Sequence, residues 1–159
     1  MGQYIIIVIF FVLYFNICGL ATTNIIRLTS GNELSVLSST CACENCGAKI
    51  TPFYQLPIIS YILCKGVCRN CKTKIPIDAL VLEIAIWIGM TMVSSLSSFS
   101  TLGVTLSFVY YELVRIVMVI IKGRRSNGFG KQYVISVFAM FPYYLVTLFV
   151  ALIYNAVCM

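Results

Sequence analysis

The sequence predicts an all-α polytopic membrane protein, with about four transmembrane helices and a small zinc-ribbon-like cytoplasmic loop domain. Hydrophobic residues make up 60% of the 159 residues and charged residues only 10%, whereas soluble domains carry roughly a quarter charged residues. A globule of this size still exposes about 30% of its chain surface, so the solvent for this much apolar surface must be lipid. The loop domain is indicated by two C-x-x-C pairs between the first two apolar runs.

The first apolar run covers residues 4–21, and the whole segment 1–21 contains no charged residue. Its length suits a hydrocarbon core of about 30 Å. A signal peptide is the alternative, but no basic residue precedes the run. We therefore expect a retained transmembrane helix here.

Three further apolar runs lie in the second half of the chain. They cover residues 79–96, 102–121 and 133–157. Pro76 precedes the first of these and is well placed at a helix start. Pro142 lies inside the last run, where membrane helices tolerate a kink. The sequence therefore predicts four spans in all.

Basic residues between the spans predict the orientation. They fall in residues 22–78 and in the basic loop 122–132, whereas the serine-rich link between the second and third spans has none. Cytoplasmic loops carry the excess of lysine and arginine, so both basic loops should be cytoplasmic and both termini outside. A nucleic-acid patch is the alternative for the basic tract of 122–125. An anchor on anionic lipid is favoured, with no nucleic acid as partner.

The loop 22–78 is the only segment long enough to fold outside the bilayer, and domains of this size commonly need a metal or disulfides. Cys43 and Cys46 are followed after 21 residues by Cys68 and Cys71. Two C-x-x-C pairs at this separation are typical of a structural Zn²⁺ held by four thiolates. Gly47 follows the first pair, where such a turn often needs a positive φ.

Other interpretations of these cysteines remain. A pair of disulfides is disfavoured because the cytoplasm keeps thiols reduced, and an iron–sulfur cluster or an empty site stays open. Four thiolates on Zn²⁺ leave a net charge of −2, which nearby basic residues could compensate: Lys49, Lys65, Arg69, Lys72 and Lys74. Cys41 and Cys64 fall outside the spacing. We expect them to be incidental, with a redox or substitute-ligand role as the alternative.

Several enzyme classes are excluded by composition. The chain has no histidine, so catalysis by Ser-His-Asp or Cys-His groups is ruled out. Asp78 is its one aspartate and it has four glutamates, which leaves little for a mechanism that needs paired carboxylates.

Residues 43–83 resemble the cytoplasmic N-terminal domain of the type IV prepilin leader peptidases. That family's pattern is C-x-x-C-G-x-x-I, then P-x-x-S-Y-x-x-x-x-G-x-C-x-x-C, then an isoleucine eight residues before a glutamate. Besides the four cysteines, the matching positions are Gly47, Ile50, Pro57, Ser60, Tyr61, Gly66, Ile75 and Glu83. Upstream, the segment that contains Asn24 and Arg27 resembles a degraded form of the sequence at the end of the family's first helix. The resemblance implies a multi-pass protein of the bacterial inner membrane, in a type IV pilus, competence or type II secretion-like system.

The second half departs from the family. Those peptidases use two aspartates at the cytoplasmic membrane face, the second within a G-x-G-D motif. Here Gly128, Gly130 and Lys131 resemble that motif with lysine in place of the acid. The first aspartate has no counterpart, and full-length members have more helices between the two acids.

Glu112 is the remaining candidate for a catalytic acid, because an intramembrane carboxylate is a functional hypothesis by default. Arg115 lies three residues on, on the same helical face. We favour a structural Glu–Arg pair that satisfies itself or packs between helices, with Arg115 snorkelling to the cytoplasmic interface, because a neighbouring cation keeps a carboxylate ionised.

Three functions follow. The first is a divergent family member that binds a prepilin or pseudopilin leader, or a pilus-assembly partner, without autonomous peptidase activity. The second is an active or partner-completed prepilin peptidase and N-methyltransferase. The third is a membrane zinc-ribbon scaffold unrelated to pilins.

Overall fold

The structure is a computed structural model that describes residues 2–29, 42–43, 45–122 and 129–158. Within these ranges the chain is helical apart from turns and two isolated β-bridges, so the predicted all-α class is confirmed. The elements are α1 (Gly2–Thr29), the 3₁₀ helix η1 (Pro52–Gln55), α2 (Ile59–Leu63), α3 (Ile77–Leu96), α4 (Thr101–Lys122) and α5 (Phe129–Cys158).

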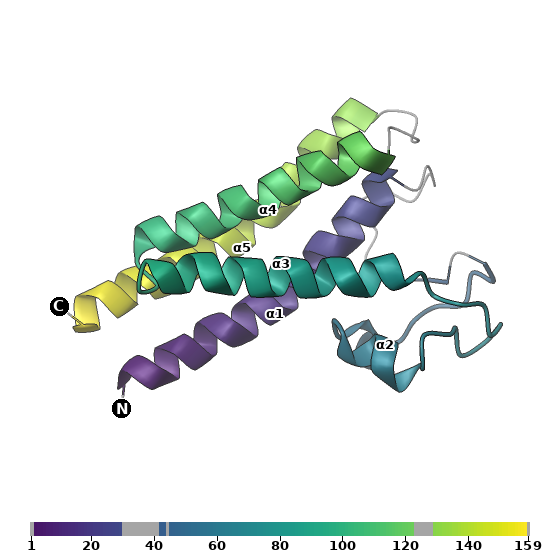
Figure 1. Ribbon diagram of the computed structural model, residues 1–159, viewed down its shortest axis with the longest axis horizontal. Coiled ribbons are helices and arrows are strands. Elements are labelled where there is room, and N and C mark those ends of the chain that lie inside the picture. Colours follow the sequence, from purple (N-terminus) through teal and green to yellow (C-terminus); the bar gives the residue numbers. More distant parts are fainter. Residues whose placement is uncertain (1, 30–41, 44, 123–128, 159) are drawn as a thin grey trace.

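Four of these helices are long and apolar enough to cross a membrane, as predicted. The candidate spans are Ile7–Thr29 in α1, Ile77–Leu96 in α3, Thr101–Lys122 in α4 and Tyr133–Ala156 in α5. The short helices η1 and α2 belong to the cysteine loop between α1 and α3 (Figure 1).

Helix α1 continues to Thr29, well beyond the end at residue 21 that the sequence suggested. Residues 22–29 therefore belong to this helix and not to the loop domain. The polar residues Thr22 and Asn24 suggested an exit from the membrane, yet both are buried in the bundle together with Ile25 and Leu28. An apolar helix can continue through polar residues such as these when other helices, and not water, surround them.

A polar contact at the centre of the bundle joins three of the long helices. The buried hydroxyl of Tyr14 in α1 lies 2.6 Å from Oγ of Ser94 in α3 and 3.0 Å from Oγ of Ser107 in α4. Near it, Trp87 of α3 packs edge-on against Phe11 of α1, with ring centroids 4.6 Å apart. Hydrogen-bonded polar groups and interlocking rings thus fix α3 and α4 against α1.

The two ends of the bundle differ in character. The termini lie together at one end, and the cysteine loop lies at the other, with the C-terminal end of α4 and the N-terminal end of α5 (Figure 1). At this second end, Lys122 Nζ of α4 lies 3.4 Å from Asp78 Oδ2 of α3. The fold therefore places Lys122 and the cysteine loop at the same end of the bundle.

Candidate metal centre

The sulfur atoms of Cys43, Cys46, Cys68 and Cys71 all lie within 4.8 Å of one another. Sγ of Cys43 and Sγ of Cys71 are 3.8 Å apart. Four sulfurs at about 2.3 Å from a tetrahedral Zn²⁺ lie about 3.8 Å from each other. A disulfide needs about 2.05 Å, and these four cysteines are free thiols. The donor set and its spacing therefore fit a tetrahedral metal ion.

Each C-x-x-C pair sits in a tight turn, which we call a knuckle: the first consists of residues 42–43 and 45–49, and the second of residues 67–74. In the first knuckle, Gly47 N–H donates to the carbonyl of Cys43 at 2.9 Å, and Cys43 N–H donates to Ala48 at 3.0 Å. A β-bridge between Ala42 and Lys49 closes this turn. The local backbone thus points both sulfurs of the pair inward.

The second knuckle repeats this pattern. Lys72 N–H donates to the carbonyl of Cys68 at 3.0 Å, Cys68 N–H donates to Thr73 at 2.8 Å, and a bridge joins Val67 to Lys74. The residue after each pair has a positive φ, 66° at Gly47 and 59° at Lys72. The positive φ at Gly47 confirms the sequence prediction, whereas that at Lys72 is unexpected because lysine disfavours this region.

Two asparagines link the knuckles, and sequence reasoning missed them. Asn45 Nδ2 donates to Sγ of Cys71 at 3.6 Å, and Asn70 Nδ2 donates to Sγ of Cys46 at 3.6 Å. Each asparagine precedes the second cysteine of its own pair and reaches the second cysteine of the other pair. The shared asparagine in C-E-N-C and C-R-N-C was the available signal.

Hydrogen bonds around the second knuckle favour the thiolate form that binds metals. The side chain and then the backbone of Thr73, followed by the side chain of Asn45, lower the pKa of Cys71 to about 5. Backbone N–H groups of Cys71 and Asn70 lower the pKa of Cys68. A hydrogen bond to a charged form stabilises that form. In the first knuckle, by contrast, the backbone hydrogen bonds from Cys46 and Asn45 are outweighed by contacts with the thiols of Cys68 and Cys46 and by burial, which raise the pKa of Cys43 to about 11. The thiolate form is therefore favoured in the second knuckle.

The other residues of the family pattern attach the knuckles to the bundle. Glu83 Oε2 in α3 accepts a hydrogen bond from the backbone N–H of Ile58 at 2.7 Å. Pro57 is buried and packs so closely on α1 that a Cβ at Gly19 would lie 2.5 Å from its Cγ. The cysteine loop is therefore fastened to both α1 and α3.

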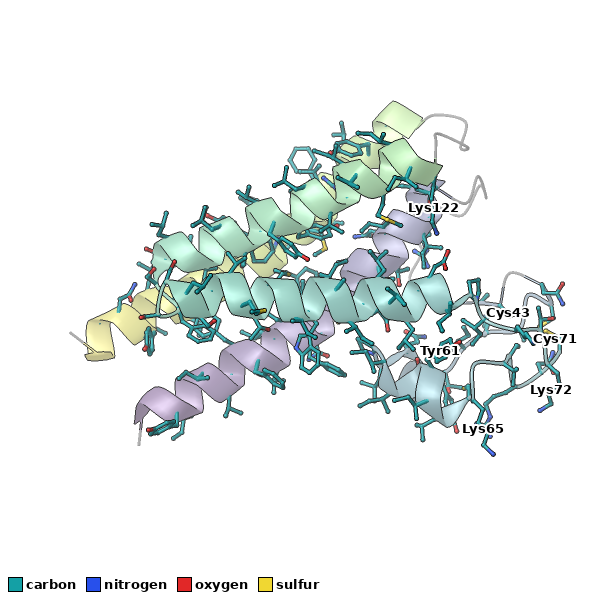
Figure 2. All side chains as sticks on the ribbon, viewed as in Figure 1. Cys43, Tyr61, Lys65, Cys71, Lys72 and Lys122 are labelled. Carbon is teal, nitrogen blue, oxygen red and sulfur yellow. The ribbon has the colours of Figure 1, made fainter. Side chains whose placement is uncertain are left out.

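Tyr61, Ser60 and Gly66 shape the connection from α2 to the second knuckle. The N–H of Gly66 donates to the carbonyl of Tyr61 at 2.9 Å, and the N–H of Cys64 donates to that of Ser60 at 2.9 Å. Gly66 has a φ of 67°, and a Cβ there would lie 2.9 Å from the Tyr61 hydroxyl. Only glycine satisfies both conditions. Figure 2 shows Tyr61 between α2 and the knuckles, with Cys43 and Cys71 at the far tip of the loop.

A cavity of about 590 Å³ lies between the knuckles and the ends of α1 and α3. Its charged lining residues are Arg27, Lys49, Arg69 and Glu83, and Arg69 lies over the ring of Tyr54, 4.4 Å from its centroid. Ile26, Ala42, Ile50, Val67, Ile75 and Ala79 supply apolar walls. Cys64 also lines this cavity and is not among the four clustered cysteines. Cys41 lies outside the described residues.

The catalytic candidates lie elsewhere. Glu112 is paired with Arg115 on α4, as the sequence indicated. Arg115, however, does not reach the interface: its side chain is fully buried, donates to Ser136 Oγ of α5 at 2.8 Å and lies over the ring of Tyr133. The snorkelling interpretation was therefore wrong, because partners on α5 hold the guanidinium inside the bundle. Gly130 and Lys131 are exposed at the start of α5, and Gly128 lies outside the described residues.

Comparison with known proteins agrees with this arrangement. Residues 6–97, more than half of the chain, match the family model described as the bacterial peptidase A24 N-terminal domain. The chain therefore belongs to the prepilin leader peptidase family, and it is a multi-pass protein of the bacterial inner membrane.

Two curated relatives carry the name prepilin leader peptidase/N-methyltransferase. The protein from Vibrio cholerae is 37% identical over 46 residues, which cover 29% of this chain and 18% of the relative. That from Burkholderia pseudomallei strain 1026b is 32% identical over 66 residues, which cover 42% of this chain and 21% of the relative. The chain thus spans about a fifth of the length of these relatives. No solved structure matches it.

Proposed function

We propose that this protein holds a structural Zn²⁺ in its cysteine loop and uses the loop, on the cytoplasmic side of the inner membrane, to bind the leader of a prepilin or pseudopilin. A pilus-assembly protein is the alternative partner. The observation that carries the proposal is the four-sulfur cluster, with all Sγ atoms within 4.8 Å, fastened to α1 and α3 beside the 590 Å³ cavity. Zinc at this place would hold the knuckle wall of the cavity in one shape.

We further propose that the protein has no peptidase activity of its own. An aspartyl mechanism needs two carboxylates that share a water, with one of them protonated. The position that resembles the family's second aspartate is Lys131, and Glu112, the other candidate, is engaged by Arg115. Binding is therefore better supported than cleavage.

A second candidate, the partner-completed enzyme, is favoured by one observation. The relatives named peptidase/N-methyltransferase match this chain over 46 and 66 residues, which are only 18% and 21% of their own length, so they extend well beyond the matched segment. A partner chain carrying the acids would then act on a leader held by this loop. A zinc-ribbon scaffold unrelated to pilins is the third candidate.

Peptide binding to the protein in lipid nanodiscs tests the proposal. A fluorescent peptide with a prepilin leader should bind, and Arg69→Ala, which removes a cation from the cavity wall, should weaken binding. Lys65→Ala is the matched control, because Lys65 is exposed and does not line the cavity. Mass spectrometry of the same samples should find the peptide intact. Equal signals from protein-containing and empty nanodiscs would reject leader binding, and cleavage or methylation upon adding a partner chain would favour the second candidate.

A further inference from the structure

The short helix α2 begins at the depth of the membrane spans. The N–H of Ile58 is bonded to Glu83, which lies six residues after the start of the span Ile77–Leu96. At 1.5 Å per residue, that places Glu83 about 9 Å inside the end of α3. Pro57 packs on Gly19, ten residues before the end of the span in α1. Two independent contacts thus hold the start of α2 below the ends of both helices.

Helix α2 exposes large aliphatic side chains at this depth. Ile59 is 41% exposed, Ile62 65% and Leu63 53%. The first turns of α3 also expose two aliphatic residues, Ile77 and Val81. Figure 1 shows α2 alongside the half of α3 that is nearest to the knuckles. Exposed aliphatic side chains therefore occur both on α2 and on the half of α3 that lies alongside it.

Lipid requires that backbone polar groups find partners within the protein, and several N–H groups of this segment do so. Ser60 N–H donates to Leu56 at 3.0 Å, Ile62 N–H to Ile58 at 3.2 Å and Cys64 N–H to Ser60 at 2.9 Å. The N–H of Ile58 precedes the helix and has no helical acceptor. Glu83 supplies its acceptor from α3.

Basic residues follow directly after this apolar segment. Lys65 ends the turn after α2, and Arg69, Lys72 and Lys74 lie on the second knuckle, all four exposed. Figure 2 shows Lys65 and Lys72 projecting from the loop. An apolar segment followed by exposed cations suits acyl chains below and anionic phosphates above.

We infer that residues 56–63 insert into the bilayer as a re-entrant element, in the leaflet on the side of the basic loops. The second knuckle then rests on anionic lipid headgroups through Lys65, Arg69, Lys72 and Lys74. The partner of this surface is the lipid bilayer itself. The cysteine loop is thus a membrane-docked structure and not one that folds wholly outside the bilayer. Insertion of this segment does not depend on which ligand the cysteine loop binds.

Tryptophan fluorescence in proteoliposomes tests the inference. Trp87 is the single native tryptophan, so Trp87→Phe gives a dark background to which Ile62→Trp is added. Lipids brominated near the headgroup end of their acyl chains should quench Ile62→Trp, and aqueous iodide should not. Lys49→Trp is the matched control and should be quenched by iodide, because Lys49 is an exposed residue of the first knuckle that the inference leaves in water. Leu63→Trp repeats the test at a second exposed position, in case Ile62→Trp fails to fold.

The inference predicts several-fold stronger quenching by brominated lipid than by iodide at residues 62 and 63, and the reverse at residue 49. Quenching of residues 62 and 63 by iodide alone would place α2 in water and overturn the inference. Protection from both quenchers would mean that a second chain covers α2, which would also overturn it.

Discussion

Asn45 of the first knuckle donates a hydrogen bond to Sγ of Cys71 in the second knuckle at 3.6 Å, and Asn70 returns the same contact to Cys46. The two knuckles are therefore linked twice by side chains outside the four-sulfur cluster. Partners of metal ligands orient them and tune their charge. Here they also set the distance between the two pairs.

Replacing Asn45 with alanine should lower zinc affinity by about tenfold to a hundredfold, the usual range for partners of metal ligands. Asn45 also donates to Thr73 Oγ1 at 2.8 Å, so its loss releases two contacts to the second knuckle. Competition with a chromogenic chelator measures the affinity. Gln55→Ala is the control, because Gln55 is an exposed amide of the same loop whose side chain bonds only to the carbonyl of Ile50. An Asn45→Ala affinity equal to that of the control would contradict a role for this bond.

The metal content itself is the second prediction. Purified protein should hold one Zn²⁺ per chain, and serine at Cys43, Cys46, Cys68 or Cys71 should release it. The loop should then become sensitive to protease, because metal binding and folding of such a site are linked. Cys64→Ser should keep its zinc, since Cys64 lies outside the cluster. Plasma emission spectrometry and limited proteolysis are the measurements, and full zinc occupancy in Cys43→Ser would reject the site.

The third prediction concerns the two positive-φ residues. Gly47→Ala should destabilise the folded, zinc-bound loop by about 1 kcal/mol, which is the free-energy cost of a Cβ in the left-handed region. The cause is conformational, since no atom of the described residues lies within 4 Å of the added Cβ. Lys72→Gly should not destabilise the zinc-bound loop. Glycine adopts a φ of 59° without strain, and this gain offsets the greater conformational freedom that glycine has in the unfolded loop. Chelator competition on both variants checks the contrast, and a destabilised Lys72→Gly would be at odds with this account.

Particular residues show what the sequence could and could not predict. The paired cysteines, Gly47 and the four apolar runs were readable, because spacing and hydropathy are local properties. The continuation of α1 through Thr22 and Asn24 was not, because burial of these residues depends on α3, α4 and α5. For the same reason the position of Arg115 was misjudged: its acceptor Ser136 lies 21 residues away on another helix. The family pattern pointed to Glu83, but only the structure gave it a bonding partner.

The fourth prediction is the topology, with both termini outside and both basic loops in the cytoplasm. A cysteine introduced at Ser98, in the exposed link between α3 and α4, should add labelling by a membrane-impermeant maleimide in intact cells. One introduced at Lys131 should add labelling only after lysis. Maleimide labelling of the native cysteines in the wild-type chain gives the baseline. Labelling of Lys131→Cys in intact cells would reverse the orientation and reopen the disulfide interpretation of the loop.

The fifth prediction is that the protein alone does not remove a prepilin leader. A lysine at the position of the second acid should impair catalysis more than a neutral residue would. Its positive charge keeps a neighbouring carboxyl ionised, whereas the paired mechanism needs one of the two acids protonated. We expect Lys131→Asp also to be inactive, since Asp78 is the one native aspartate of this sequence and we propose that it does not replace the family's first aspartate. The assay is leader cleavage by purified protein in detergent at neutral pH, beside a full-length family member.

Glu112→Gln separates the structural from the catalytic role of that glutamate. If Glu112 only neutralises Arg115, the variant should be less stable and should change no activity. Removing one partner of a buried ion pair costs about 3–5 kcal/mol, and a smaller loss is expected here because Glu112 is one-third exposed. Thermal unfolding in detergent measures this loss, and Leu113→Gln, at an exposed neighbour, controls for an added amide. Leader cleavage by the native chain that disappears in Glu112→Gln, but not in Leu113→Gln, would make Glu112 catalytic, because a purely structural pair has no reacting group to lose.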